Sequence, residues 1–165
     1  MLKAQHPEFE TWATSVHADA GVTCVDCHMP YMRKNGQKYT SHYMGNPLNY
    51  IDDACLKCHD ESAQTLTARV KTIGDNTFKI QKIAGETVAK AHLTIKAAMD
   101  AGATDEQLAA PRLALREAQW YWDWVSASNG MGFHNPDRAL RTLGLSIDKA
   151  HQAIELTNAV VKGSL

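Results

Sequence analysis

The pattern Cys-x-x-Cys-His occurs twice in this sequence, and its two copies use all four cysteines of the 165-residue chain. The copies are Cys24-Val25-Asp26-Cys27-His28 and Cys55-Leu56-Lys57-Cys58-His59. At this spacing two thiols can form thioethers to the two vinyl groups of one haem, and the adjacent histidine then lies beneath the iron as its proximal ligand. The sequence therefore predicts two covalently attached c-type haems, one at each copy.

Other chemistries also use four cysteines, but each leaves part of this pattern unexplained. A zinc site would need the two cysteine pairs to share one metal ion, with His28 and His59 incidental. A thioredoxin-like redox site would need a βαβ context that the sequence lacks. Two disulfides would leave both histidines without a role. The haem interpretation accounts for all six residues.

Composition and charge restrict the class of protein further. Charged residues make up 21% and hydrophobic residues 44% of the chain, which is ordinary for a globular protein. The formal net charge of -1 gives no reason to expect a nucleic-acid partner. No apolar run approaches the roughly 20 residues of a membrane span, and the first residues lack the apolar region of a signal peptide. Because haem attachment follows export, we expect a periplasmic protein, present here as a mature form or a fragment.

The chain divides into two regions of different texture. Residues 1–60 hold all four cysteines, five of the eight histidines and three of the five prolines. Glycine and proline interrupt this region, so we expect a dihaem-binding part made of loops and short helices, one of them at Pro7 to Val16. Residues 61–165 are expected to form a long-helix region for haem packing and dimerisation, in one folding unit with the rest.

Residues 61–165 carry apolar side chains three and four positions apart, the period of an amphipathic helix. This pattern predicts three helices, at about 62–101, 104–128 and 136–163. The second begins at Thr104-Asp105-Glu106-Gln107, which resembles a capping box, and runs through Pro111, which bends or restarts it. The third follows Asn135, an N-cap with proline at the first helical position.

These elements predict an all-α protein, because no segment alternates with period two. The architecture is a loop-rich haem-binding part followed by three helices, at least one of them very long. At ~1.5 Å per residue the first helix is on the order of 60 Å long, which exceeds a compact domain of this size. Such a helix usually packs against something else, such as a partner subunit; an intramolecular helical hairpin is the alternative.

Six histidines outside the two motifs are candidates for the second axial position of an iron. They are His6, His17, His42, His92, His134 and His151. His17, His42 and His134 lie in loops or at helix ends, from which a side chain can be aimed at a neighbouring haem. His92 and His151 lie inside predicted helices, where a surface or core role is the usual outcome.

Several further segments agree with one known family in order and spacing over essentially the whole chain. They are Lys3-Ala4-Gln5-His6-Pro7-Glu8 before Trp12, His17, Cys27-His28-Met29-Pro30, Ser41-His42, Gly45-Asn46-Pro47, Ala91-His92, Ala118-Gln119-Trp120 and Met131-Gly132-Phe133-His134-Asn135-Pro136. On these segments the sequence resembles the pentahaem, ammonia-forming cytochrome c nitrite reductases. The resemblance covers the C-terminal portion of that family, about its last third.

The resemblance implies which histidines ligate which iron. The two haems correspond to the fourth and fifth haems of the family. His134 matches the distal ligand of the haem held by the motif ending in His28, and His17 matches that of the haem held by the motif ending in His59. His42 matches the distal ligand of the second haem of the family, whose attachment motif this chain does not contain.

The resemblance also implies roles beside the substrate. His6 matches the active-site histidine over the substrate-binding haem. Gln5, through its side chain, and Lys3, through its backbone carbonyl, match ligands of a calcium ion next to that site, and both oxygens are suitable hard ligands. The long C-terminal helices imply a homodimer. A membrane-bound multihaem quinol dehydrogenase is the electron donor in the family.

The departures from the family limit what this chain can do alone. The catalytic haem of the family is held by a Cys-x-x-Cys-Lys motif, which is absent from this sequence. The active-site arginine and tyrosine of the family lie in its N-terminal portion. The expected function is therefore the electron-transfer part of an enzyme that reduces nitrite to ammonium. The alternative is a stand-alone dihaem electron-transfer cytochrome, and a lysine-type motif upstream in the gene discriminates between the two.

Overall fold

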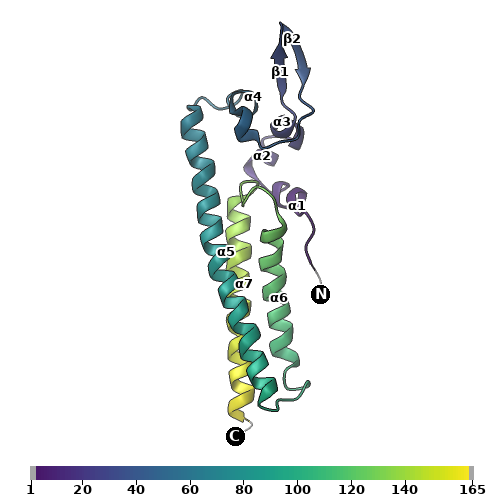
Figure 1. Cartoon of the computed structure of the whole chain (residues 1–165), viewed down its shortest axis with the longest axis vertical. Helices are drawn as coiled ribbons and strands as arrows, with labels where there is room; N and C mark the ends of the chain where they lie inside the picture. Colours follow the sequence, from purple (N-terminus) through teal and green to yellow (C-terminus); the bar gives the residue numbers. More distant parts are fainter. Residues whose placement is uncertain (1–2, 164–165) are drawn as a thin grey trace.

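The molecule is an elongated three-helix bundle with the short elements of its first 60 residues gathered at one end (Figure 1). The computed structural model describes residues 3–163. The bundle helices are α5 (Ala63–Asp100), α6 (Ala109–Ala127) and α7 (Pro136–Gly163). At ~1.5 Å per residue, the 38 residues of α5 span about 57 Å. The very long first helix is therefore confirmed, as is the mostly helical fold.

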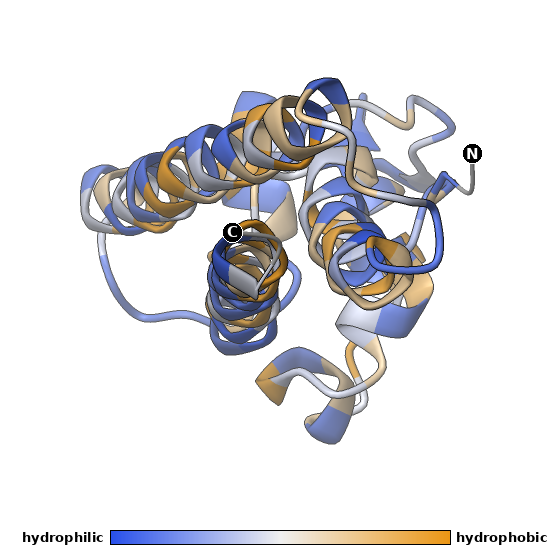
Figure 2. Cartoon of the chain, turned by 90° about the horizontal axis from the view of Figure 1, so that it is seen from below, coloured by the Kyte–Doolittle hydropathy of each residue, from blue (hydrophilic) through white to orange (hydrophobic). Residues whose placement is uncertain are grey.

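The bundle core consists mainly of small side chains. The buried residues of α5 are Leu66, Thr77, Ala84, Val88, Ala91, Ile95 and Ala98, and they fall on one stripe of the helix. Ala114 and Ala118 of α6 and Ala150 and Ala153 of α7 meet this stripe. Seen from the lower end, the three helices surround a shared interior (Figure 2). Alanine at these contacts lets the helix backbones approach closely, which explains a long, thin bundle.

The helix ends follow the sequence signals with one exception. The Asn135 side chain accepts a hydrogen bond from the backbone N–H of Arg138 at 3.0 Å, so α7 begins at its predicted N-cap. Thr104 and Gln107 bond to each other as in a capping box, at 2.8 and 3.2 Å, but the regular helix starts only at Ala109. Pro111 consequently lies in the first turn of α6, where a missing N–H is tolerated.

The N-terminal part contains a β-hairpin that the sequence pattern did not predict. Its strands are β1 (Tyr31–Lys34) and β2 (Gln37–Thr40), paired antiparallel. Asn35 and Gly36 join them with φ of 52° and 76°, as a two-residue turn of this kind requires. Both faces are largely exposed, so the alternation of apolar and polar residues that marks a half-buried strand is missing.

Short helical elements precede and follow this hairpin. They are α1 (Glu8–Trp12), α2 (Val16–Asp19) and α3 (Cys24–His28) before it, and the 3-10 turn η1 (Pro47–Tyr50) and α4 (Ile51–Ala54) after it. The single helix expected at Pro7 to Val16 is divided, because Ser15 accepts a bond from Ala18 N–H at 3.2 Å and starts a new helix. Among residues 3–163, no helix is both long and apolar enough to cross a membrane.

Candidate haem-binding site

The structure brings four of the predicted ligands together as two facing pairs of imidazole rings. The ring centroids of His28 and His134 lie 6.2 Å apart, with 44° between the ring planes. Those of His17 and His59 lie 6.3 Å apart, with 75° between the planes. In each pair one histidine ends a Cys-x-x-Cys-His motif and the other comes from a distant segment. The pairing is the one that the family resemblance implies.

These separations fit coordination of one metal ion between the two rings of each pair. A bond between a metal ion and an imidazole nitrogen is about 2.0–2.1 Å long. Since that nitrogen lies about 1.1 Å from the ring centroid, two rings on opposite sides of one ion have centroids about 6.2–6.4 Å apart. Both observed separations lie in this interval, so each pair of rings has the spacing expected of two axial ligands of one metal ion.

A polar group lies beside the outer ring nitrogen of each proximal candidate. Nδ1 of His28 lies 3.2 Å from the carbonyl oxygen of Gly45. That carbonyl can only accept, so it favours the proton on Nδ1 and leaves Nε2 free to ligate. The Tyr50 hydroxyl donates to the same carbonyl at 3.0 Å. On the second motif, Nδ1 of His59 lies 3.5 Å from a carboxylate oxygen of Glu61.

Close packing orients the distal candidate His134. Its Nδ1 is buried without a hydrogen bond of normal geometry, and the Asn129 backbone is a polar neighbour. Gly130 lies against the ring: a Cβ at this position would stand 3.2 Å from Cε1 of His134. With φ of +85°, Gly130 also has a conformation that side chains rarely adopt. Glycine is needed here for both reasons.

Electrostatics favours the neutral form of both distal candidates. Burial lowers the pKa of His134, and the facing His28 lowers it further. Burial and the facing His59 likewise lower the pKa of His17. Neutral imidazole is the form that ligates a metal ion, so the environment prepares both rings for coordination.

None of the four cysteines is paired in a disulfide, and all four lie near the same end of the bundle. Cys24 and Cys58 are exposed, whereas Cys27 and Cys55 are half-buried. Burial raises the pKa of the Cys27 thiol, and the nearby Cys55 raises it further. The two motifs therefore lie close together in space. In residues 3–163 no three His, Cys, Asp or Glu side chains converge as they would around one ion.

The segment with the expected active-site histidine is tied to the loop after α6. His6 is 75% exposed and has a positive φ of 46°. Its Nδ1 lies 3.8 Å from Glu8 Oε1 and 3.5 Å from Asn129 Nδ2. The same Glu8 oxygen accepts hydrogen bonds from the Asn129 backbone and side chain, at 2.7 and 2.9 Å. Glu8 thus links His6 to the loop that carries His134.

The remaining predicted site residues lie apart from the two pairs. Lys3 and Gln5 are exposed on the segment before His6. His42 is exposed just after β2 and belongs to neither pair. His92 and His151 are exposed on α5 and α7.

Three contributors to the site were not predicted from the sequence. The Gly45 carbonyl accepts a bond from His28, the Glu8 carboxylate lies 3.8 Å from Nδ1 of His6, and the ring of Phe133 lies 6.0 Å from that of His17. A backbone carbonyl has no signature in a sequence. Glu8 and Phe133 stand in segments that carry the family resemblance, but their contacts arise only from tertiary packing.

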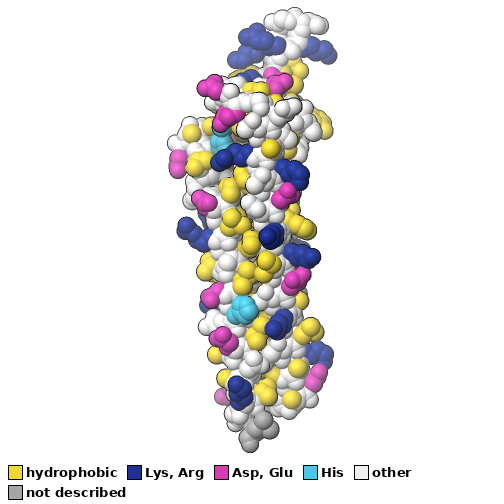
Figure 3. Space-filling view, turned by 90° about the vertical axis from the view of Figure 1, so that its left-hand side faces the viewer, with side chains coloured by type: hydrophobic (Ala, Val, Ile, Leu, Met, Phe, Trp, Pro, Cys, Tyr) yellow, Lys and Arg dark blue, Asp and Glu magenta, His cyan; other side chains and the backbone are white. Residues whose placement is uncertain are grey.

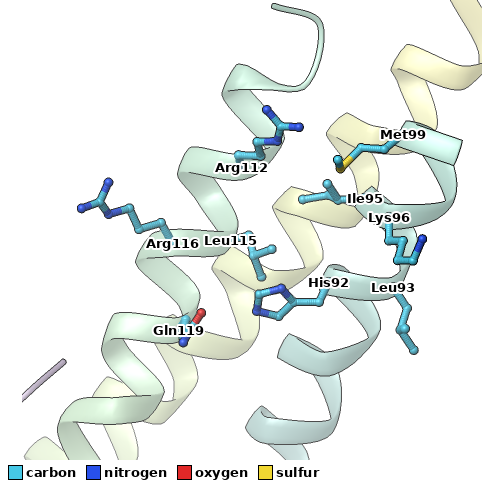
Figure 4. A pocket seen from close by; sticks show the side chains of 9 residues that line it. All are labelled: His92, Leu93, Ile95, Lys96, Met99, Arg112, Leu115, Arg116 and Gln119. Atoms are coloured by element: carbon cyan, nitrogen blue, oxygen red, sulfur yellow. The ribbon is translucent and has the colours of Figure 1, made fainter. Parts of the chain in front are cut away.

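A separate open groove of about 470 Å³ lies between α5 and α6 near the opposite end of the bundle (Figure 4). Ile95 and Leu115 contribute buried apolar surface to it. Lys96 and Arg112, on its rim, are paired with Asp100 and Asp105 at 2.8 and 2.7 Å. His92 lines this groove rather than the histidine pairs.

Solved structures with the same fold include two cytochromes. A cytochrome c nitrite reductase from Desulfovibrio desulfuricans, described for the two calcium sites of its catalytic subunit, superposes with a TM-score of 0.90 at 40% identity. The match covers 96% of this chain and 34% of that chain. The outer cell wall cytochrome OcwA superposes with a TM-score of 0.59 at 27% identity, over 90% of this chain and 30% of that one.

Sequence relatives agree with this result. Cytochrome c-552 of Aliarcobacter butzleri is 42% identical over 163 residues, which are 98% of this chain and 33% of that protein. Cytochrome c-552 of Haemophilus ducreyi is 44% identical over 154 residues, 93% of this chain and 31% of that protein. The chain thus spans about a third of the length of the curated relatives it matches. The cytochrome c552 family matches residues 1–164, and the chain therefore belongs to this family.

Proposed function

We propose that this chain is the electron-transfer portion of an ammonia-forming cytochrome c nitrite reductase. The observation that carries the proposal is the presence of two facing pairs of imidazole rings. The ring centroids of His28 and His134 lie 6.2 Å apart, and those of His17 and His59 lie 6.3 Å apart. Each set includes the histidine of a haem-attachment motif. The 0.90 superposition on a solved cytochrome c nitrite reductase supports the assignment to this enzyme class.

The reaction of the whole protein converts nitrite, with six electrons and eight protons, into ammonium and two water molecules. Haems attached at the two motifs would supply one-electron transfer. His28 with His134 and His17 with His59 would hold them, and two histidine ligands would leave no open position, so this chain would conduct electrons and bind no substrate there. Substrate chemistry then belongs to an N-terminal portion with the lysine-type motif, the arginine and the tyrosine of the family.

His6 is the residue of this chain proposed to reach the substrate. An imidazole can hold and release a proton near neutral pH. A protonated His6 would attract the nitrite anion and stabilise negative charge that develops on the departing oxygens. Its exposed side chain, held by Glu8 and Asn129, is free to face a pocket completed by another part of the protein.

Two further groups are proposed to complete sites with the rest of the protein. The Lys3 carbonyl and the Gln5 side-chain oxygen would provide part of a calcium site, with the hard ligands that this ion prefers. His42 would be the distal ligand of a haem attached outside this chain. All three residues are exposed, which is consistent with partners elsewhere.

The proposed assembly is a periplasmic homodimer joined through α5. Leu93 and Phe78 are 69% and 59% exposed and lie off the buried stripe of this helix. Along the bundle, apolar side chains lie between charged ones on the surface in view in Figure 3. In the proposed dimer, the same face of a second copy would present the same alternation of apolar and charged side chains. The proposed electron donor is a membrane-bound multihaem quinol dehydrogenase, as in the family.

The test compares the 165-residue chain with the full-length protein in an anaerobic assay of ammonium from nitrite, with a reduced viologen as donor. The full-length protein should turn over and the chain alone should not. In the full-length protein, His6→Ala should lower the rate by ~10²–10⁴-fold, the range for a general acid or base. His151→Ala, a change of an exposed histidine on α7, is the matched control. Six-electron turnover by the isolated chain would refute the proposal, and a gene without the lysine-type motif would favour the stand-alone cytochrome.

A further inference from the structure

The turn between α6 and α7 carries two consecutive side chains that reach different histidine pairs. His134 faces His28, with ring centroids 6.2 Å apart. Phe133 packs on the other distal candidate: its ring centroid lies 6.0 Å from that of His17, with 36° between the planes. One turn therefore contributes a proposed ligand to one haem and an aromatic neighbour to the ligand of the other.

This turn has a backbone with little freedom to rearrange. Gly130 and Gly132 have φ of +85° and +79°. The Phe133 N–H donates to the Gly130 carbonyl at 2.9 Å, which closes the turn. A Cβ on Gly132 would stand 2.4 Å from Oγ1 of Thr77, a buried residue of α5. The backbone from which the Phe133 side chain extends therefore has a fixed conformation.

The segment that bears His17 is docked onto the same turn. Asn135 donates from its side-chain amide to the carbonyl and the hydroxyl oxygens of Thr14, at 2.9 and 3.1 Å. Arg138 donates to the Glu10 carbonyl at 2.8 Å. These bonds hold the two segments together, so the position of Phe133 beside His17 is fixed by hydrogen bonds as well as by the packing of the two rings.

We propose that Phe133 is a positioning residue for His17, which fixes the plane of this imidazole and shields it from water. The proposal rests on the assignment of His17 as an axial ligand. The orientation of a ligand and the polarity around it tune the potential of a haem. An apolar ring disfavours the extra positive charge of ferric iron, so Phe133 keeps the potential of the haem on Cys55 and Cys58 higher than exposure to water would.

The test uses the full-length, haem-loaded protein in potentiometric titrations and electron paramagnetic resonance. His17→Ala and His134→Ala first assign the low-spin signals to the two haems. Phe133→Ala is then expected to lower the potential of the haem on Cys55 and Cys58, and to change its g values because the imidazole can rotate. We expect the ferric-to-ferrous ratio at a fixed potential to rise by at least about threefold, or about 28 mV for a one-electron couple.

Three variants make the outcome specific to the ring contact. Phe133→Tyr retains the ring and should behave as the wild type. Phe133→Leu retains apolar volume without a flat ring, so it should change the g values and, if Phe133→Ala does not fold, replaces it. Phe9→Ala removes an exposed aromatic residue that packs on Trp12 and should change the potential and g values of neither haem.

The results distinguish a wrong role for Phe133 from a wrong assignment of His17 as an axial ligand. Unchanged g values and potentials in both the Phe133→Ala and Phe133→Leu proteins overturn the role of Phe133, as does a shift confined to the haem on Cys24 and Cys27. If His17→Ala leaves every low-spin signal in place, the ligand assignment itself is wrong, and the positioning role is lost with it.

Discussion

Replacing Gly132 by alanine should destabilise the protein by an amount that the structure allows us to divide into two parts. A residue other than glycine in the left-handed region costs about 1–2 kcal/mol, and Gly132 has φ of +79°. The new methyl group would also stand 2.4 Å from Thr77 Oγ1, whose residue is only 1% exposed. Overpacking of this kind costs about 1–3 kcal/mol. We expect a total loss of about 2–5 kcal/mol.

Gly102 offers a matched control for the backbone part alone. It has φ of +92°, and a Cβ added there would meet no atom within 4 Å, so Gly102→Ala should lose only the conformational part. The Gly132→Ala protein should therefore melt lower than the Gly102→Ala protein by about 2–12 °C, since 1 kcal/mol corresponds to about 2–4 °C at this chain length. Thermal unfolding of the haem-loaded proteins, followed by circular dichroism, measures the difference.

The steric part can be isolated by combining the change with Thr77→Ala, which removes the hydroxyl that the new methyl group meets. The double variant should recover part of the loss, so the two changes should not be additive. Equal melting temperatures for the two glycine variants, or simple additivity with Thr77→Ala, would refute the steric argument.

Three other predictions concern ligation, assembly and capping. His134→Ala should leave the haem on the first motif five-coordinate and able to bind carbon monoxide; an unchanged absorption spectrum with carbon monoxide would contradict the pairing. The Leu93→Asp change should dissociate the proposed dimer of the full-length protein in sedimentation velocity, whereas Leu113→Asp, at a similarly exposed site on α6, should not. The Asn135→Ala change should destabilise the protein by about 1–3 kcal/mol, from lost capping and lost bonds to the segment before His17. Asn46→Ala, at an exposed cap, should cost less in the same denaturant titration.

The long helices could be predicted because their apolar period repeats many times. Helices α5 and α7 begin within one residue of the predicted starts. The start of α6 was predicted too early, since Thr104 and Gln107 form their reciprocal bonds in a turn that precedes the helix. A local pattern identifies the bonds but not whether the helix continues from them.

The haem-attachment residues follow from the spacing that the chemistry of a c-type haem requires, and their thioether bonds stay a prediction. The sequence pattern alone could not predict which distal histidine faces which motif, because His17 and His134 lie 117 residues apart and each meets its partner only in the folded chain. The resemblance to a family supplied that pairing. The contact of Phe133 with His17 and the bond from His28 Nδ1 to the Gly45 carbonyl depend on tertiary packing, which no local pattern encodes.

The hairpin of β1 and β2 has a consequence for local opening. A two-stranded hairpin by itself is marginally stable in water, and this one is held mainly by its turn, by the Lys38 ammonium 4.0 Å from the Tyr31 ring and by a bond from Lys57 to the Tyr31 carbonyl. Its amide protons should therefore exchange with solvent well before those of the bundle.

Such opening need not disturb the ligand that precedes the hairpin. His28 is held by residues outside the two strands: its ring bonds to the Gly45 carbonyl, and the Tyr50 hydroxyl, which donates to that carbonyl at 3.0 Å, also lies 3.3 Å from the His28 carbonyl oxygen. The segment that follows the hairpin leads to His42, which has no such support in the described chain. The hairpin can thus open or change its position against a neighbouring part of the protein while His28 stays in place.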